Sequence, residues 1–163
     1  LLPAVEKKYH TYAQDITYEA LKASRRHRGF SGFSMGSCTT WFTFINYLDL
    51  FSVFVPLSGD CWAVECLGGE RKTTETVDAL VDAVVKSGYG TGDYTIFTAA
   101  GTKDPAGNML TPQVEEMKKR KNIFVYDDNF SKGNFHYILA EGEFHAYEAV
   151  CNYLYNYLPY LFD

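Results

Sequence analysis

The pentapeptide Gly32-Phe33-Ser34-Met35-Gly36 decides the fold, because it matches G-x-S-x-G between a predicted strand and a predicted helix. Residues 27–33 mix glycine with phenylalanine, which is typical of a brief strand that enters a tight turn. Residues 36–48 carry apolar side chains at helical spacing. The pattern predicts a strained elbow that exposes the hydroxyl of Ser34 as a nucleophile. A glycine-rich turn without chemistry is the alternative.

The rest of the chain alternates between strand and helix patterns. The expected strands cover residues 27–33, 51–57, 94–100 and 135–140. The expected helices cover residues 1–24 with a break near Gln14 and Asp15, then 36–48, 73–87, 111–120 and 146–160. The helix at 111–120 is expected to open at Thr111 and Pro112, and threonines at the start of 73–87 offer capping oxygens. Because parallel strands need crossover connections, we expect an α/β fold with a mostly parallel sheet and flanking helices, and the elbow indicates the α/β-hydrolase fold.

A serine hydroxyl needs a histidine base, which in this fold follows the nucleophile and the acid along the chain. His10 and His27 precede Ser34 and are therefore excluded. His136 lies inside a predicted strand, where a histidine is usually a structural residue. His145 follows the turn after that strand, at the sheet edge where catalytic groups gather. We therefore expect His145 to be the base, with His136 as the alternative.

The acid is expected in a loop at the same edge of the sheet. Asp104 follows the strand predicted at 94–100 and can reach the imidazole from there. Asp60 follows the preceding strand and is the main competitor. The amide of Met35, at the start of a helix, is the candidate donor to an oxyanion. A Ser34, Asp104 and His145 triad follows as the hypothesis, and it needs no metal or cofactor.

Aromatic residues in the loops near this edge are candidate substrate contacts. Trp62, Tyr89 and Phe144 lie close in sequence to the predicted catalytic loops, and Trp62 is the one that we assign to substrate binding. Core packing is the competing interpretation for each of them. Glu143 is expected to be a solvated turn residue.

Composition excludes several other functions. The chain has 163 residues, 47% of them hydrophobic, and a net charge of -5, which suits one domain and argues against nucleic acid as a partner. The two basic clusters, residues 25–28 and 118–121, are expected to be solvated. No apolar run is long enough for a membrane helix. Four cysteines without a paired C-x-x-C pattern predict neither a disulfide scaffold nor a zinc site.

These motifs resemble carbohydrate esterase family 1, the esterase D-like group, and within it the feruloyl esterases. The resemblance runs through the elbow, Pro56-Leu57-Ser58-Gly59-Asp60, Gly101-Thr102-Lys103-Asp104 and Glu141-Gly142-Glu143-Phe144-His145, and so covers nearly the whole chain. It implies a Ser34, Asp104 and His145 triad and a secreted enzyme that acts on feruloylated arabinoxylan. This chain departs from many members at Ser37 and Cys38, where they have glycine, and at the turn before the histidine.

Four alternatives stay open beside this interpretation. Three are enzymes: an acetylxylan esterase, an esterase like S-formylglutathione hydrolase, and a prolyl-peptidase-like hydrolase, which uses a similar elbow. The fourth is a non-catalytic fragment or binding module. The family also implies several strands before the elbow, one of whose loops supplies a second oxyanion amide. Residues 1–163 are therefore expected to be the C-terminal portion of a single α/β-hydrolase domain, or to be completed by a second chain that supplies the N-terminal half.

Overall fold

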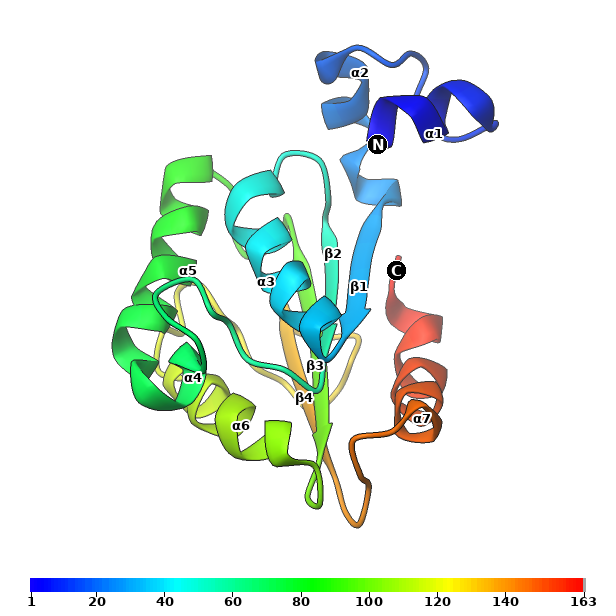
Figure 1. Cartoon of the computed structure of the whole chain (residues 1–163). Coiled ribbons are helices and arrows are strands. Elements are labelled where there is room, and N and C mark those ends of the chain that lie inside the picture. The colour runs from blue at the N-terminus through cyan, green and yellow to red at the C-terminus, as the bar shows by residue number, and fades with distance from the viewer. Residues whose placement is uncertain (163) are drawn as a thin grey trace.

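Four strands form one parallel sheet in which the spatial order follows the chain, β1-β2-β3-β4. The strands are β1 (Gly29–Phe33), β2 (Val53–Leu57), β3 (Thr95–Gly101) and β4 (Phe135–Ala140). The computed structural model describes residues 1–162, and the strands run the same way in Figure 1. Their carboxyl ends therefore meet at one edge, where the following loops come together. This arrangement confirms the predicted α/β fold and all four predicted strands.

Three helices cover one face of the sheet. They are α3 (Met35–Tyr47), α5 (Thr73–Ser87) and α6 (Pro105–Met117). Trp41, Phe44 and Leu80 are fully buried there against Phe54 and Ile96 of the central strands. Every residue of β2 is buried. A strand covered on both faces needs apolar side chains at successive positions, which explains its unbroken Val-Phe-Val-Pro-Leu sequence.

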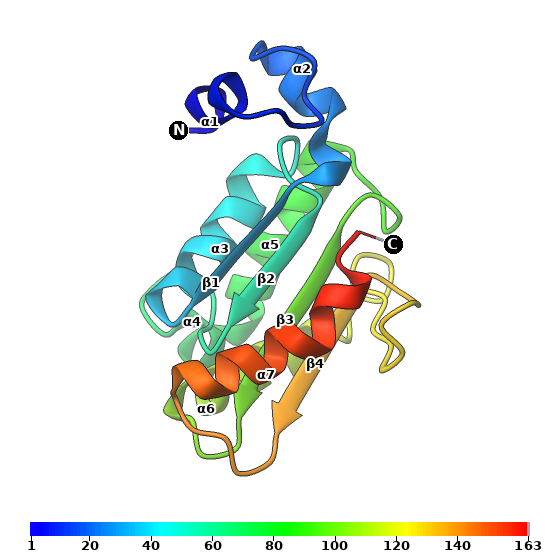
Figure 2. The same ribbon diagram turned by 90° about the vertical axis from the view of Figure 1, so that its right-hand side faces the viewer.

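The opposite face is covered by α7 (Tyr147–Tyr157), which crosses in front of the sheet in Figure 2 and is followed by a 3-10 turn, η2 (Leu158–Tyr160). Tyr153 and Tyr157 of α7 are buried against Val55, Phe97 and Ala99. The hydroxyl of Tyr157 donates to the carbonyl of Thr98 over 2.5 Å. Because a buried phenol needs such a partner, this bond allows a tyrosine to stand in the core of the α7 layer.

The N-terminal segment contains two short helices, α1 (Leu2–Lys8) and α2 (Tyr18–Ala23), which stand beyond the amino end of β1 in Figure 1. A 3-10 turn, η1 (Arg25–His27), links them to the sheet. The prediction that residues 25–28 are solvated holds for Arg26 and His27, which are exposed, but was wrong for Arg25. Arg25 is buried and donates to the carbonyls of Leu48, Phe51 and Asp93, each over 2.7 Å. The planar guanidinium supplies enough fixed donors to bind three backbone carbonyls at once.

The largest error in the predicted elements concerns α6, which begins at Pro105 and not at Thr111. The carboxylate of Asp104 accepts the amide of Ala106 over 2.8 Å and so caps the helix, with Pro105 in its first turn. Pro112 consequently lies inside the helix. Two further details differ. The expected loop 58–72 contains a short helix, α4 (Gly68–Arg71), and no threonine side chain caps α5.

Candidate active site

Ser34 lies at the sharp turn between β1 and α3. Its backbone angles are φ 59° and ψ -117°, a region that a non-glycine residue rarely adopts. The amide of Ser34 donates to the carbonyl of Leu57 over 2.9 Å, which fixes the turn against the end of β2. A Cβ on Gly32 would lie 2.2 Å from the carbonyl oxygen of Gly36, so strand and helix can approach this closely only with glycine at position 32. The structure thus places Ser34 in a strained strand-turn-helix elbow.

The two glycines of the elbow are expected to respond differently to alanine. In Gly32→Ala the new methyl group would overlap backbone atoms of Gly36, and we expect the free energy of unfolding to fall by at least about 3 kcal/mol. A Cβ on Gly36 meets nothing within 4 Å. Gly36→Ala should therefore keep or raise stability, by roughly 0.5–1 kcal/mol from helix propensity. Urea unfolding followed by circular dichroism measures both, and a larger loss in Gly36→Ala would contradict this account.

His145 and Asp104 complete a chain of hydrogen bonds with Ser34. The Nε2 atom of His145 lies 2.9 Å from Oγ of Ser34, and Nδ1 lies 2.9 Å from Oδ1 of Asp104. An ionised carboxylate can only accept, so Nδ1 carries the proton and Nε2 is free to accept from the serine hydroxyl. The three residues follow β1, β3 and β4 in turn. The structure therefore brings together the three residues that the sequence singled out.

Asp104 is held firmly for its contact with His145. Its side chain is fully buried, and Oδ1 also accepts the amide of Ala106 at the start of α6. The positive end of a helix dipole favours a carboxylate at this position. His145 is more open, with 36% of its side chain exposed, and the ring of Phe33 packs 4.5 Å from its centre. The carboxylate is thus fully buried, while the imidazole is partly exposed at the surface.

The competing histidine has a structural environment. His136 is fully buried in β4, where Nδ1 lies 2.8 Å from the carbonyl oxygen of Asp127. Its ring stacks on Phe97 with the centres 4.8 Å apart. Burial lowers the pKa of His136, because the charged imidazolium would lose its hydration. The structure places His136 away from Ser34, as part of the α7 layer.

Asp60, the alternative candidate for the acid, does not bind the histidine. Asp60 follows β2 and is buried, but its oxygens accept from the indole of Trp62 and the amide of Gly69, each over 2.8 Å. The bonds found for His145 go to Asp104 and Ser34 instead. Asp60 thus belongs to the wall of the site and not to the chain of hydrogen bonds.

The amide of Met35 is placed to donate beside the hydroxyl of Ser34. Met35 is the first residue of α3, where backbone amides have no partner within the helix. Within residues 1–162, no hydrogen bond uses this amide. A free amide at a helix N-terminus next to the nucleophile can stabilise a developing oxyanion.

A hollow of about 340 Å³ opens beside Ser34 and His145. Apart from these two residues and Asp60, its lining is mostly apolar, with Met35, Cys38, Ser58, Gly59, Trp62, Leu67, Pro105, Ala106 and Met109. Trp62 thus lines the hollow as the sequence suggested, whereas Tyr89 and Phe144 do not. Pro105 and Met109 are one turn apart on α6 and share a face. Sequence reasoning missed them because it began this helix at Thr111.

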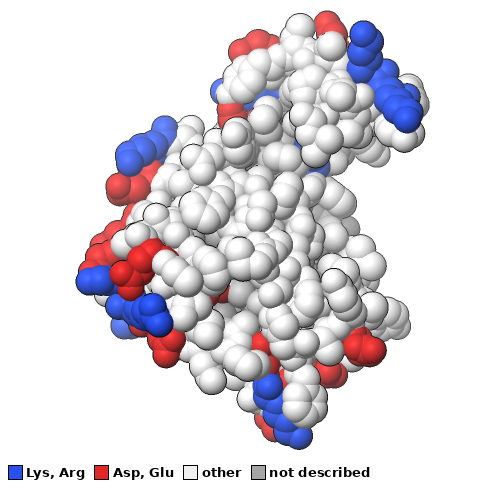
Figure 3. Space-filling model, in the orientation of Figure 1, with Lys and Arg blue, Asp and Glu red and all other residues white. Residues whose placement is uncertain are grey.

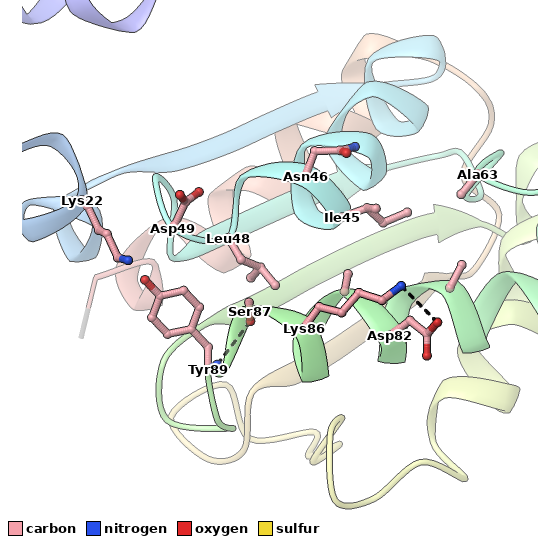
Figure 4. Close-up of a pocket in the computed structure, with 12 residues that line it drawn as sticks. Lys22, Ile45, Asn46, Leu48, Asp49, Ala63, Asp82, Lys86, Ser87 and Tyr89 are labelled. Carbon is pink, nitrogen blue, oxygen red and sulfur yellow. Dashed lines mark hydrogen bonds and ion pairs between the residues drawn. The ribbon is translucent and has the colours of Figure 1, made fainter. Parts of the chain in front are cut away.

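A larger hollow, of about 640 Å³, lies between α3 and α5 (Figure 4). Asp82 and Lys86 pair with each other on its rim over 3.4 Å, and Tyr89 stands at one end. No histidine or cysteine is among its lining residues. It therefore offers neither a histidine base nor a cysteine nucleophile, and the Ser34, His145 and Asp104 hydrogen bonds lie at the smaller hollow.

Other kinds of site find little support in the described part of the chain. Figure 3 shows acidic and basic side chains interspersed around the edge of one face, with a broad uncharged area between them. Within residues 1–162, no cluster of histidine, cysteine and acidic residues is arranged to hold a metal ion. None of the described helices is both long and apolar enough to span a membrane.

Comparison with known proteins relates the chain to feruloyl esterases. It is 40% identical over 162 residues to endo-1,4-beta-xylanase Y of Acetivibrio thermocellus, covering 99% of this chain and 14% of that protein. A serine-to-alanine mutant of the feruloyl esterase module from Clostridium thermocellum, complexed with sinapinate, superposes with a TM-score of 0.90 at 40% identity. That match covers 99% of this chain and 54% of the module. The chain thus spans about half the length of the solved module that it matches, and the expected resemblance to feruloyl esterases is confirmed.

More distant structures share the fold. S-formylglutathione hydrolase from Staphylococcus aureus superposes with a TM-score of 0.57 at 14% identity, covering 94% of this chain and 65% of that one. No protein-family model matches the sequence. Together with the parallel sheet and flanking helices, these neighbours confirm the α/β-hydrolase fold.

Proposed function

We propose that this chain carries the nucleophile, base and acid of a serine esterase that releases ferulate from feruloylated arabinoxylan. The observation that carries the proposal is the chain of two 2.9 Å hydrogen bonds from Ser34 through His145 to Asp104, at the rim of an apolar hollow. The 40% identity to a module described as a feruloyl esterase supports the substrate class. A polysaccharide of plant cell walls lies outside the cell that degrades it, so secretion is part of the proposal.

Acylation begins when the hydroxyl of Ser34 attacks the ester carbonyl carbon. His145 takes the hydroxyl proton on Nε2 as the bond forms, and Asp104 accepts from Nδ1–H and stabilises the imidazolium. The carbonyl oxygen becomes an oxyanion, to which the Met35 amide donates. The tetrahedral intermediate then collapses, the bond between the acyl carbon and the sugar oxygen breaks, and His145 gives its proton to that oxygen, so that the sugar leaves as the alcohol. The product of this half-reaction is feruloyl-Ser34.

Deacylation repeats the same steps with water as the nucleophile. His145 removes a proton from the water as it attacks the acyl carbonyl, and the second tetrahedral intermediate collapses to ferulate. The proton on Nε2 passes back to the Ser34 oxygen, which restores the resting state. Three side chains and one backbone amide thus perform both half-reactions without a net change.

The hollow beside Ser34 suits a flat aromatic acyl group. Trp62, Met35 and Met109 present an indole and two thioethers, which make favourable contacts with aromatic rings. An acetyl group would leave most of the 340 Å³ unfilled. The shape and polarity of the hollow therefore favour a feruloyl ester over an acetyl ester.

The substrate class is tested with two 4-nitrophenyl esters that share a leaving group and differ in the acyl group. We expect kcat/KM for the ferulate to exceed that for the acetate on the order of 10²-fold, because the aromatic acyl group buries far more apolar area. S-Formylglutathione serves as a third substrate and should be turned over poorly. Preference for acetate would contradict the feruloyl assignment. Turnover of none of the three by a folded sample would contradict the catalytic proposal and favour a binding module.

A further inference from the structure

The loop between β2 and α4 holds a buried carboxylate that the proposed mechanism does not use. Asp60 is 1% exposed. Among the described residues, no lysine, arginine or histidine forms an ion pair with it, and the negative charge of Glu70 adds to the rise in its pKa. Burial raises the pKa of Asp60, while hydrogen bonds from Trp62 and Gly69 act in the opposite direction. A buried acid without a cation is costly, so its presence calls for a role other than stability.

Each carboxylate oxygen of Asp60 accepts one hydrogen bond. Oδ1 accepts from Nε1–H of Trp62 and Oδ2 from the amide of Gly69, both over 2.8 Å. A Cβ on Gly69 would lie 2.6 Å from the Cβ of Asp60, so the backbone at the start of α4 packs directly against the side chain of Asp60. The carboxylate of Asp60 thus links the indole of Trp62 to the backbone of Gly69, where the loop after β2 enters α4.

The indole held in this way forms part of the wall of the hollow beside Ser34. Trp62 is partly buried and lines the hollow together with Ser34 and His145. Nε1 is the only polar atom of its side chain, so one bond at that atom decides how the ring is turned. The second tryptophan, Trp41, differs because it is fully buried and donates to the carbonyl of Gly59. Trp41 therefore packs in the hydrophobic core, whereas Trp62 lines the hollow beside Ser34.

We infer that Asp60 is a positioning residue that turns the indole of Trp62 so that its face forms one wall of the aromatic acyl pocket. The inference rests on the proposed function for the identity of the ligand. In Asp60→Asn the amide oxygen can still accept from one donor, but the amide nitrogen then faces the N–H of the other. Trp62 or Gly69 must lose its bond, and the ring or the loop that carries it must move.

The test measures binding of methyl ferulate to Ser34→Ala, a background in which the ester is not consumed. Calorimetry gives the Kd for this background alone and with Asp60→Asn, Trp62→Phe or both changes. We expect each single change to weaken binding roughly tenfold, as for loss of a hydrogen bond to a charged group. The double change should weaken it no further, because both act through the same ring. Glu65→Gln is the matched control, since Glu65 is an exposed acid in the same loop, and it should leave the Kd within twofold.

A second readout separates positioning from a general loss of structure. With Ser34 intact, Asp60→Asn should raise KM for methyl ferulate and lower kcat/KM for this ester more than for 4-nitrophenyl acetate, because the acetyl group is too small to use the wall. Trp62→Phe keeps Asp60 and an aromatic ring but lacks the N–H, so its Kd decides the matter if Asp60→Asn does not fold.

The outcomes distinguish this inference from the proposed function. Unchanged Kd values in Asp60→Asn or Trp62→Phe, or fully additive losses in the double variant, would overturn the positioning role even if ferulate esters are hydrolysed. Coupled losses of affinity in a protein that hydrolyses no ester would uphold the positioning role and overturn the proposed function.

Discussion

Replacing Ser34 with alanine is expected to lower kcat for methyl ferulate by about 10⁴ to 10⁶-fold, because it removes the atom that forms the acyl-enzyme. The residual rate would come from binding and from the Met35 amide, neither of which needs the hydroxyl. Substrate binding should persist, since the hollow keeps its walls. Steady-state kinetics on the purified variant measure the loss, and calorimetry with methyl ferulate measures the binding that remains.

Ser31→Ala is the matched control for this experiment. Ser31 lies three residues earlier on β1, and its hydroxyl donates to the carbonyl of Val55 over 3.0 Å. Its removal should change kcat by less than about threefold, because Ser31 contacts neither substrate nor His145. A sulfonyl fluoride should add to the wild-type protein and not to Ser34→Ala, as read by intact mass. A Ser34→Ala variant within tenfold of wild type would refute the nucleophile assignment.

Asp104→Asn is expected to reduce kcat by about 10⁴-fold with little loss of stability. An asparagine can place N–H toward His145 and so favour the tautomer that protonates Nε2, which then cannot accept the proton of Ser34. Because Oδ1 of Asp104 meets both His145 and the amide of Ala106, an asparagine in this orientation gives up the N-cap of α6, and the free energy of unfolding should fall by about 1 kcal/mol. Kinetics and urea unfolding on one sample separate the two effects.

Asp60→Asn makes the same chemical change at the competing acid. We expect it to retain kcat for 4-nitrophenyl acetate within about threefold, since Asp60 does not contact His145. The opposite pattern, an active Asp104→Asn and an inactive Asp60→Asn, would transfer the acid role to Asp60. The pair therefore decides between the two carboxylates that the sequence left open.

The sequence predicts the sheet well because each strand of this fold has a strong local signal. The apolar run at β2 and the alternation of strand and helix patterns around Ser34 indicate a parallel sheet before any tertiary contact is known. Fold topology then places the residues after β1, β3 and β4 at one edge, and the elbow motif and the order of nucleophile, acid and base along the chain point to Ser34, Asp104 and His145 there. Their roles in catalysis stay a prediction until the variants are measured.

The features that the sequence did not reveal depend on contacts between distant segments. Asp104-Pro105 and Thr111-Pro112 are equally good helix starts by local chemistry, and only the packing of the helix decides between them. The burial of Arg25 is set by carbonyls 23, 26 and 68 residues further along the chain. The bond from Trp62 to Asp60 requires a loop conformation that no periodicity encodes. Propensity cannot anticipate such contacts, because each exists only once the tertiary structure has formed.

The distance along the chain between the hydrogen-bonded residues of the site has a consequence for folding. Ser34 and His145 are 111 residues apart, and Asp104 and His145 are 41 apart. Contacts between such remote residues form only after large loops have closed, so β4 must dock on β3 before the imidazole can reach the hydroxyl. The elbow itself can form earlier, from neighbouring residues. During refolding, labelling of Ser34 by a sulfonyl fluoride should therefore lag behind the recovery of the helical circular dichroism signal. The reactivity of this one hydroxyl would then report when the last steps of assembly take place.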